Sequence, residues 1–300
     1  MIQRYKKIVV DVGEIKGSKK MELTILRATK TKEFGGPHIH EVYIDECQDN
    51  KIIDYELILK LFGRAECIFM AGDVAQCIAR GSTFRFRELY ELIYQWNLKR
   101  DLKNQYKSLK PKEFELNVNY RSHKGILQLA SSVIHLLHVF FPDSIDKLSP
   151  EFSEVSGPQP LIIEGCEAET LFVYRNDNRK ENVFIEFGAG QVIIVRDETA
   201  KKRVKDINSD IGLVLTVFEA KGMEFNDVLL YNFFTDSPAL LKWEVILSDL
   251  DDYSAWIPKF SPECHYILSS ELKHLYVAIT RAREHLWIFD EDAKLSESIL

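Results

Sequence analysis

Short apolar runs separated by polar residues dominate the first third of this chain. Val42 to Ile44 and Cys67 to Ala71 are compact runs of aliphatic and aromatic side chains, which is the pattern of buried strands. Between them, residues 52–62 carry apolar side chains at helical spacing. The hydrophobic pattern therefore predicts a strand, a helix and a second strand, as in sheets built from parallel strands.

The rest of the chain continues this alternation. Ser122 is the expected N-cap of a helix whose apolar face reaches Phe141. The other expected strands are residues 8–12, 161–163, 183–187, 191–195, 213–217, 228–231 and 286–289, and the other expected helices are residues 89–96, 198–207 and 272–283. We expect an α/β fold with parallel sheets in two domains, residues 1–110 and 111–300, the second with an irregular insertion at residues 232–270.

Composition narrows the class of protein. The 300 residues are 46% hydrophobic and 28% charged, as in an ordinary globular chain, and the net charge is −7. Basic residues gather at 1–36 and 97–124, so a local basic groove remains compatible with the negative total. Five widely spaced cysteines without a C-x-x-C pair argue against a disulfide framework and a zinc site. We expect a cytoplasmic or nuclear protein.

Polar side chains follow the two strands of the first third. Asp45 and Glu46 come directly after the first strand, and Asp73 and Gln76 follow the second. Ligands of open α/β sheets bind at the carboxyl ends of strands. There, one carboxylate can hold Mg²⁺ while its neighbour activates water for attack on a phosphate. A solvated acidic turn is the structural alternative.

Arginines and aromatic residues are interleaved farther along the chain. Arg80, Phe84, Arg85 and Phe86 combine guanidinium groups with rings, a combination that suits single-stranded nucleic acid. The same residues also fit the start of a helix with both phenylalanines in the core, and the sequence leaves the two readings open.

Five segments, in this order, resemble motifs II to VI of the UvrD/Rep-like superfamily 1 helicases. They are Asp-Glu-Cys-Gln-Asp (45–49), Gly-Asp-Val-Ala-Gln (72–76), Asn-Tyr-Arg-Ser (119–122), Ala-Lys-Gly-Met-Glu-Phe (220–225) and Tyr-Val-Ala-Ile-Thr-Arg-Ala-Arg (276–283). The resemblance covers residues 40–290. The alternating arginine and phenylalanine residues after Gln76 resemble the corresponding segment of eukaryotic members that carry tetratricopeptide or ankyrin repeats.

The resemblance implies two RecA-like lobes of the P-loop NTPase type, with ATP and Mg²⁺ as cofactors and single-stranded nucleic acid as partner, DNA being favoured over RNA. Asp45 would hold Mg²⁺, Glu46 would activate water and Gln76 would contact the γ-phosphate. The residues implied for the second lobe are Tyr120 stacking on adenine, Arg121 and Arg281 as arginine fingers, and Glu224 at the ribose. Asp73 and Gly222 would complete the nucleotide site, and Thr216 would join the nucleic-acid surface.

The chain also departs from the family pattern. No G-x-x-x-x-G-K-[ST] loop occurs, since the glycines at 13 and 17 have the wrong spacing, so the first lobe is expected to be incomplete. Phe218 replaces the usual histidine of motif V, and Ala79 stands where relatives often place stacking aromatics. We expect the chain alone to hydrolyse ATP negligibly and to need a missing half-lobe from a longer polypeptide. The alternative is a non-catalytic nucleic-acid- or protein-binding relic of the helicase fold.

Overall fold

The computed structural model describes residues 40–62, 67–79, 84–104, 111–147, 149–163, 190–207, 212–239, 242–250 and 260–291. The predicted strands at 8–12 and 183–187, the basic loop at 16–20 and Arg80 lie outside the described residues. Two compact units divide the chain: residues 1–71 with 88–111, and residues 72–87 with 112–300. Residues 72–87 therefore group with the second unit, although the sequence analysis assigned them to the first domain.

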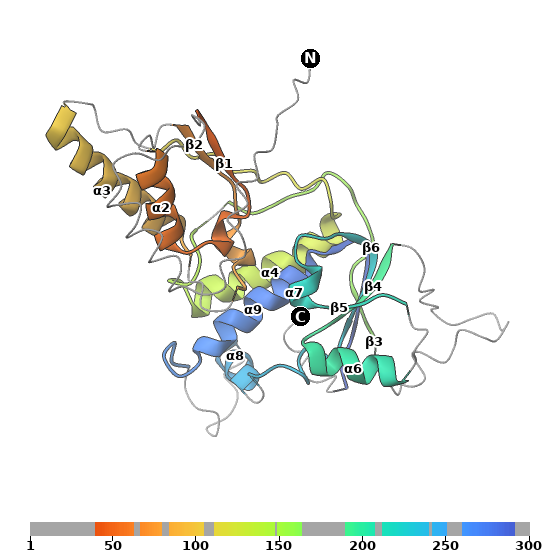
Figure 1. Cartoon of the computed structure of the whole chain (residues 1–300). Helices are drawn as coiled ribbons and strands as arrows, with labels where there is room; N and C mark the ends of the chain where they lie inside the picture. The colour runs from red at the N-terminus through yellow and green to blue at the C-terminus, as the bar shows by residue number, and fades with distance from the viewer. Residues whose placement is uncertain are drawn as a thin grey trace, which may run out of the picture. The chain divides into compact units, whose positions relative to one another are not determined.

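The first unit contains a small parallel sheet (Figure 1). Strands β1 (Val42–Ile44) and β2 (Ile68–Met70) pair in register, Val42 opposite Ile68, and helix α2 (Ile52–Phe62) connects them with the predicted bounds. The short 3₁₀ helix η1 (Cys47–Asp49) follows β1, and α3 (Phe86–Asn104) belongs to this unit from residue 88 onward. The predicted strand, helix and strand are confirmed.

The second unit is built on a five-stranded, fully parallel sheet with the order β3-β7-β6-β4-β5. Its strands are β3 (Leu161–Ile163), β4 (Gln191–Val195), β5 (Val214–Thr216), β6 (Phe225–Tyr231) and β7 (Ala282–Phe289). Its helices are η3 (Val74–Gln76), α4 (Lys124–Phe140), α6 (Glu198–Ile207), α7 (Val217–Ala220), α8 (Trp243–Leu250) and α9 (Tyr266–Ile279).

Both faces of this sheet are buried, as expected for parallel strands covered by helices. Ile193 and Val195 of β4 pack with Ala200 and Val204 of α6 on one face. Helices α4 and α9 lie on the other side of the sheet (Figure 1). Among the residues that the structure describes, no helix combines the length and apolar character needed to cross a bilayer.

Several element boundaries differ from the prediction, among them those of α3, α4, α9, β6 and β7. The N-cap of α4 is His123, whose side chain accepts a hydrogen bond from the Gly125 amide, whereas the Ser122 hydroxyl donates to the Ala282 carbonyl at 2.6 Å. Helix α9 begins at Tyr266 and ends at Ile279, and β7 starts at Ala282 because it pairs with β6 along most of its length. The stretch expected to be irregular contains α8 and the first turn of α9.

Candidate functional site

The first candidate group is the acidic turn after β1. Asp45 and Glu46 are both exposed, and Oδ1 of Asp45 accepts a hydrogen bond from the Glu46 amide at 2.9 Å. Glu46 adopts the left-handed conformation, with φ 49° and ψ 45°, and its carboxylate accepts a hydrogen bond from the buried Gln48 amide group. That backbone conformation costs a non-glycine residue about 1 kcal/mol or more, and such strain concentrates at functional sites. The turn leaves Asp45 and Glu46 side by side and exposed to solvent.

The segment after β2 presents a different polar group. Asp73 caps η3, since its carboxylate accepts hydrogen bonds from the Ala75 amide and from Nε2 of Gln76, both at 2.9 Å. Burial raises the pKa of the Asp73 carboxyl, and the nearby Glu151 charge acts in the same direction. Asp73 thus fixes the direction of the Gln76 side chain, whose oxygen is left for another donor.

That donor is Arg281, which lies between the end of α9 and the start of β7. Its side chain is 1% exposed, and Nη2 donates to Oε1 of Gln76 at 3.2 Å. Nε donates to the Val277 carbonyl at 2.9 Å, and Nη1 donates to the Met223 carbonyl at 3.0 Å. The structure therefore brings together two predicted site residues that are 205 positions apart in the chain.

Glu224, which follows Met223 in the chain, forms ion pairs with two arginines. Glu224 accepts a hydrogen bond from Nε of Arg121 at 2.7 Å, and its other oxygen lies 3.4 Å from Nη1 of Arg283. Tyr120, beside Arg121, is 88% exposed, so its ring can receive a planar group. Gly222 has φ 77°, a conformation that strains other residues, which explains glycine at this turn.

These residues sit at an edge of the second unit's sheet that the sequence argument did not predict. Glu224 and Arg281 directly precede β6 and β7, so they lie at the amino ends of those strands. Asp45 and Glu46 lie at the carboxyl end of β1, as the sequence predicts, whereas Glu224 and Arg281 lie at the amino ends of their strands. The reason is local: the turn after α7 and the end of α9 supply the side chains before each strand begins.

The predicted nucleic-acid residues are largely engaged inside the protein. Phe84 is 3% exposed, which favours the core reading of this ring over the stacking reading. Nε of Arg85 lies 3.3 Å from the Asp146 carboxylate, and the Phe86 amide donates to the same group at 2.8 Å. Thr216 is buried and forms a capping box with Glu219 at the start of α7.

Several residues that the sequence analysis did not single out extend the polar network. Tyr276 on α9 donates from its hydroxyl to Glu151 at 3.1 Å and lies 3.4 Å from Oδ2 of Asp73. Oε2 of Glu151 accepts a hydrogen bond from Nδ2 of Asn119 at 2.9 Å. Tyr276 and Asn119 belong to segments quoted above as motifs, whereas nothing in the sequence around Glu151 marks it.

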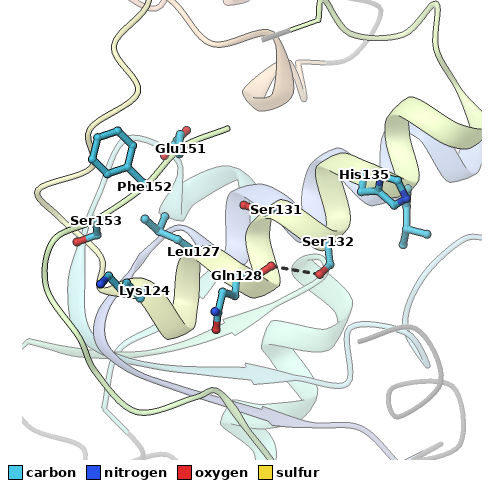
Figure 2. A pocket seen from close by; sticks show the side chains of 10 residues that line it. Lys124, Leu127, Gln128, Ser131, Ser132, His135, Glu151, Phe152 and Ser153 are labelled. Atoms are coloured by element: carbon cyan, nitrogen blue, oxygen red, sulfur yellow. Dashed lines mark hydrogen bonds between the residues drawn. The ribbon is translucent and has the colours of Figure 1, made fainter. Parts of the chain in front are cut away.

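A cavity of about 720 Å³ opens beside α4 (Figure 2). Lys124, Leu127 and Gln128 line it from the helix, and Glu151, Phe152 and Ser153 line it from the loop. None of the predicted site residues lines this cavity. Elsewhere, Asp227, Glu284 and His285 place potential ligand atoms within 4.8 Å of one another, although Asp227 and Nδ1 of His285 already pair at 2.7 Å.

Two family models match parts of the chain that contribute to this network, including Gln76, Glu224 and Arg281. Residues 20–89 match the UvrD/REP helicase N-terminal domain, and residues 191–291 match the UvrD-like helicase C-terminal domain. This chain belongs to the UvrD-like helicase family. The resemblance inferred from the five motifs is thereby confirmed, and the parallel α/β fold of the UvrD-like chain agrees with two RecA-like lobes.

The curated relatives are longer proteins. The UvrD-like chain is 41% identical over 276 residues to TPR and ankyrin repeat-containing protein 1 of Homo sapiens, covering 85% of this chain and 9% of that protein. It is 25% identical over 259 residues to a probable DNA helicase of Mycoplasma pneumoniae, covering 83% of this chain and 43% of that protein. The chain therefore spans less than half the length of these relatives, and the human relative fits the eukaryotic branch with repeats.

Solved structures give a weaker likeness. The crystal structure of Arterivirus nonstructural protein 10 (helicase) is 17% identical and covers 88% of this chain and 42% of that chain, with a TM-score of 0.39. At that level the likeness adds nothing to the family assignment, which rests on the sequence matches.

Proposed function

We propose that this chain is the motif-bearing portion of an ATP-dependent motor that moves on single-stranded nucleic acid. The observation that carries the proposal is the contact between Arg281 and Gln76, continued through Met223 and Glu224 to Arg121. These residues come from four distant segments and meet in one network. Transfer of a phosphoryl group needs cations that approach from several directions, and a preorganised arginine cluster meets that need.

The residues fit ATP and Mg²⁺ as cofactors. Two exposed carboxylates at the end of a parallel strand suit a divalent cation, and the exposed Tyr120 ring suits an adenine face. Bound Mg²⁺ would neutralise charge on the phosphate oxygens. Asp45 would hold the cation, Glu46 would orient water, Gln76 would report on the terminal phosphate, and Arg121 and Arg281 would stabilise the charge that develops on it.

Single-stranded DNA is the nucleic acid on which we propose that the motor moves. A probable DNA helicase among the relatives favours DNA over RNA. The chain's net charge of −7 and the internal pairing of Arg85 indicate weak binding that depends strongly on salt.

The phosphate-binding loop is the missing element of this proposal. The 300 residues contain no G-x-x-x-x-G-K-[ST], the loop whose amides and lysine hold the β- and γ-phosphates. Positioning supplies much of the rate of phosphoryl transfer. We therefore propose that turnover needs a longer polypeptide that supplies this loop, and that the chain alone hydrolyses ATP negligibly.

Steady-state ATP hydrolysis, with and without single-stranded DNA, tests the proposal. The full-length polypeptide that contains this chain should show DNA-stimulated hydrolysis, and Glu46→Gln should reduce it by about a hundredfold or more. Glu41→Gln, on an exposed carboxylate just before β1, is the matched control and should leave the rate unchanged. Stimulated hydrolysis by the 300 residues alone would contradict the need for a further loop.

A non-catalytic binding module is the second candidate. Phe218 in place of the motif V histidine and the burial of Phe84 favour it, because both weaken the expected link to nucleic acid. Binding of single-stranded DNA by the full-length polypeptide without any ATP hydrolysis would favour this candidate over the motor.

A further inference from the structure

We propose that Glu151 is a positioning residue that holds the turn carrying Tyr120 and Arg121 against helix α9. The role of this turn in nucleotide binding rests on the proposed function. The hydrogen bonds that Glu151 forms do not depend on it. Glu151 lies on the loop beside the amino-terminal half of α4 (Figure 2) and belongs to none of the five motifs.

The two oxygens of the Glu151 carboxylate serve different segments. Oε2 accepts a hydrogen bond from Nδ2 of Asn119 at 2.9 Å, and Oε1 accepts one from the Tyr276 hydroxyl at 3.1 Å. Asn119 precedes the Tyr120 turn, and Tyr276 lies on α9 one turn before Arg281. A single carboxylate therefore joins the two segments that carry the predicted arginine fingers.

The Asn119 side chain passes this constraint to the turn. Its Oδ1 accepts hydrogen bonds from the backbone amides of Arg121 and Ser122, both at 2.9 Å. An amide side chain that donates from one end and accepts at the other cannot rotate without breaking both sets of bonds. Glu151 thus fixes Asn119, and Asn119 fixes the backbone on which Arg121 stands.

The same carboxylate is coupled to Asp73. The Tyr276 hydroxyl lies 3.4 Å from Oδ2 of Asp73 and carries one proton, so it can donate to only one of the two carboxylates at a time. Asp73 in turn orients Gln76, the partner of Arg281. Burial raises the pKa of both Asp73 and Tyr276, in keeping with a closed network. Loss of Glu151 should therefore loosen the turn first, while Asp73 retains Tyr276.

Residue-resolved hydrogen exchange on the 300-residue chain tests this role. Glu151→Met keeps the side-chain length and removes both acceptors, so the amides of Arg121 and Ser122 should exchange about tenfold faster. Glu151→Gln retains one acceptor for Asn119 and should stay close to the unaltered chain. Glu154→Met, on an exposed carboxylate of the same loop, is the matched control and should change nothing at these amides.

Unchanged exchange at both amides in Glu151→Met would overturn the proposal, and so would an equal increase in the β4 and β6 amides, which would indicate general destabilisation. If Glu151→Met does not fold, Tyr276→Phe removes one of the two bonds to Glu151. It should then raise exchange at the same two amides by a smaller factor, and no increase would again overturn the proposal.

A measurement of nucleotide affinity distinguishes failure of the Glu151 proposal from failure of the proposed function. A fluorescent ATP analogue, titrated into the full-length polypeptide with Mg²⁺, should bind about tenfold more weakly to Glu151→Met, because Tyr120 and Arg121 are no longer held. If the unaltered polypeptide binds no analogue, the proposed function fails, while the exchange pattern still decides the role of Glu151.

Discussion

The buried ion pair between Arg196 and Glu271 allows a quantitative prediction. Glu271 on α9 is 1% exposed, and its carboxylate accepts hydrogen bonds from Nε of Arg196 at 2.7 Å and from the Ser237 hydroxyl at 2.8 Å. A second bond joins Nη2 of Arg196 to the other carboxylate oxygen. The Ser237 hydroxyl also accepts from Nε1 of Trp243 at 3.1 Å. The pair thus connects the end of β4, helix α9 and the start of α8.

Arg196→Met should remove the cation and leave the Glu271 carboxylate buried with the Ser237 hydroxyl. Breaking a buried pair by removing one partner costs about 3–5 kcal/mol, a large share of the free energy of unfolding of a typical domain. Adding Glu271→Gln removes the stranded charge and keeps an acceptor for Ser237. The double variant should therefore recover more than half of the loss.

Urea denaturation, followed by tryptophan fluorescence, measures these changes, since Trp243 is fully buried within the network. Arg283→Met is the matched control because Arg283 pairs with Glu224 at 3.4 Å where both side chains are about half exposed, and it should cost less than about 1 kcal/mol. The reasoning is refuted if Arg196→Met costs no more than this control, or if the double variant is no more stable than Arg196→Met alone.

Three further predictions concern titration, packing and reactivity. Burial lowers the pKa of His274 from 6.5 to about 4, so on acidification the unfolded chain takes up a proton on this imidazole at a higher pH than the folded chain does. The free energy of unfolding should therefore fall by about 3 kcal/mol as the pH drops from 6.5 to 4. Urea titrations across this pH range should show the fall, and His274→Leu should flatten it. Gly125→Ala would place a Cβ 2.4 Å from the Pro158 carbonyl oxygen, and thermal melting should show a loss of about 1–3 kcal/mol, absent in the exposed Ser132→Ala on the same helix. Burial raises the pKa of Cys47 to about 11, so iodoacetamide at pH 8 should alkylate the exposed Cys264 first, and equal rates would contradict this assignment.

Much of the architecture could be predicted from hydrophobic spacing. Helix α2 has the predicted bounds, because the polar residues Asp49, Asn50 and Lys51 directly precede its apolar stripe and mark where the helix begins. The start of helix α9 was predicted too late in the chain because Ser269, Ser270 and Glu271 interrupt the apolar pattern, although Glu271 is buried. The partners of Glu271 come from distant parts of the chain, namely Arg196 and Ser237. Local pattern carries no information about such partners.

The candidate site was predictable in its residue types but not in its geometry. The motifs named Arg281 and Gln76, but their contact depends on how α9 packs against η3. The N-cap of α4 moved from Ser122 to His123 because the Ser122 hydroxyl pairs with Ala282, 160 residues away. Glu151 could not be found at all, because its role depends on partners brought to it by folding rather than on its neighbours in sequence.

The assignment of residues 72–87 to the second unit has a practical consequence for protein engineering. The chain passes from one unit to the other at 71–72, at 87–88 and at 111–112, so no single cut yields an intact second unit. A fragment beginning at Lys112 would leave Asp146 without Arg85 and Arg281 without Gln76. An expression fragment should therefore carry residues 72–87, either through a linker that bypasses residues 88–111 or as a separate co-expressed peptide.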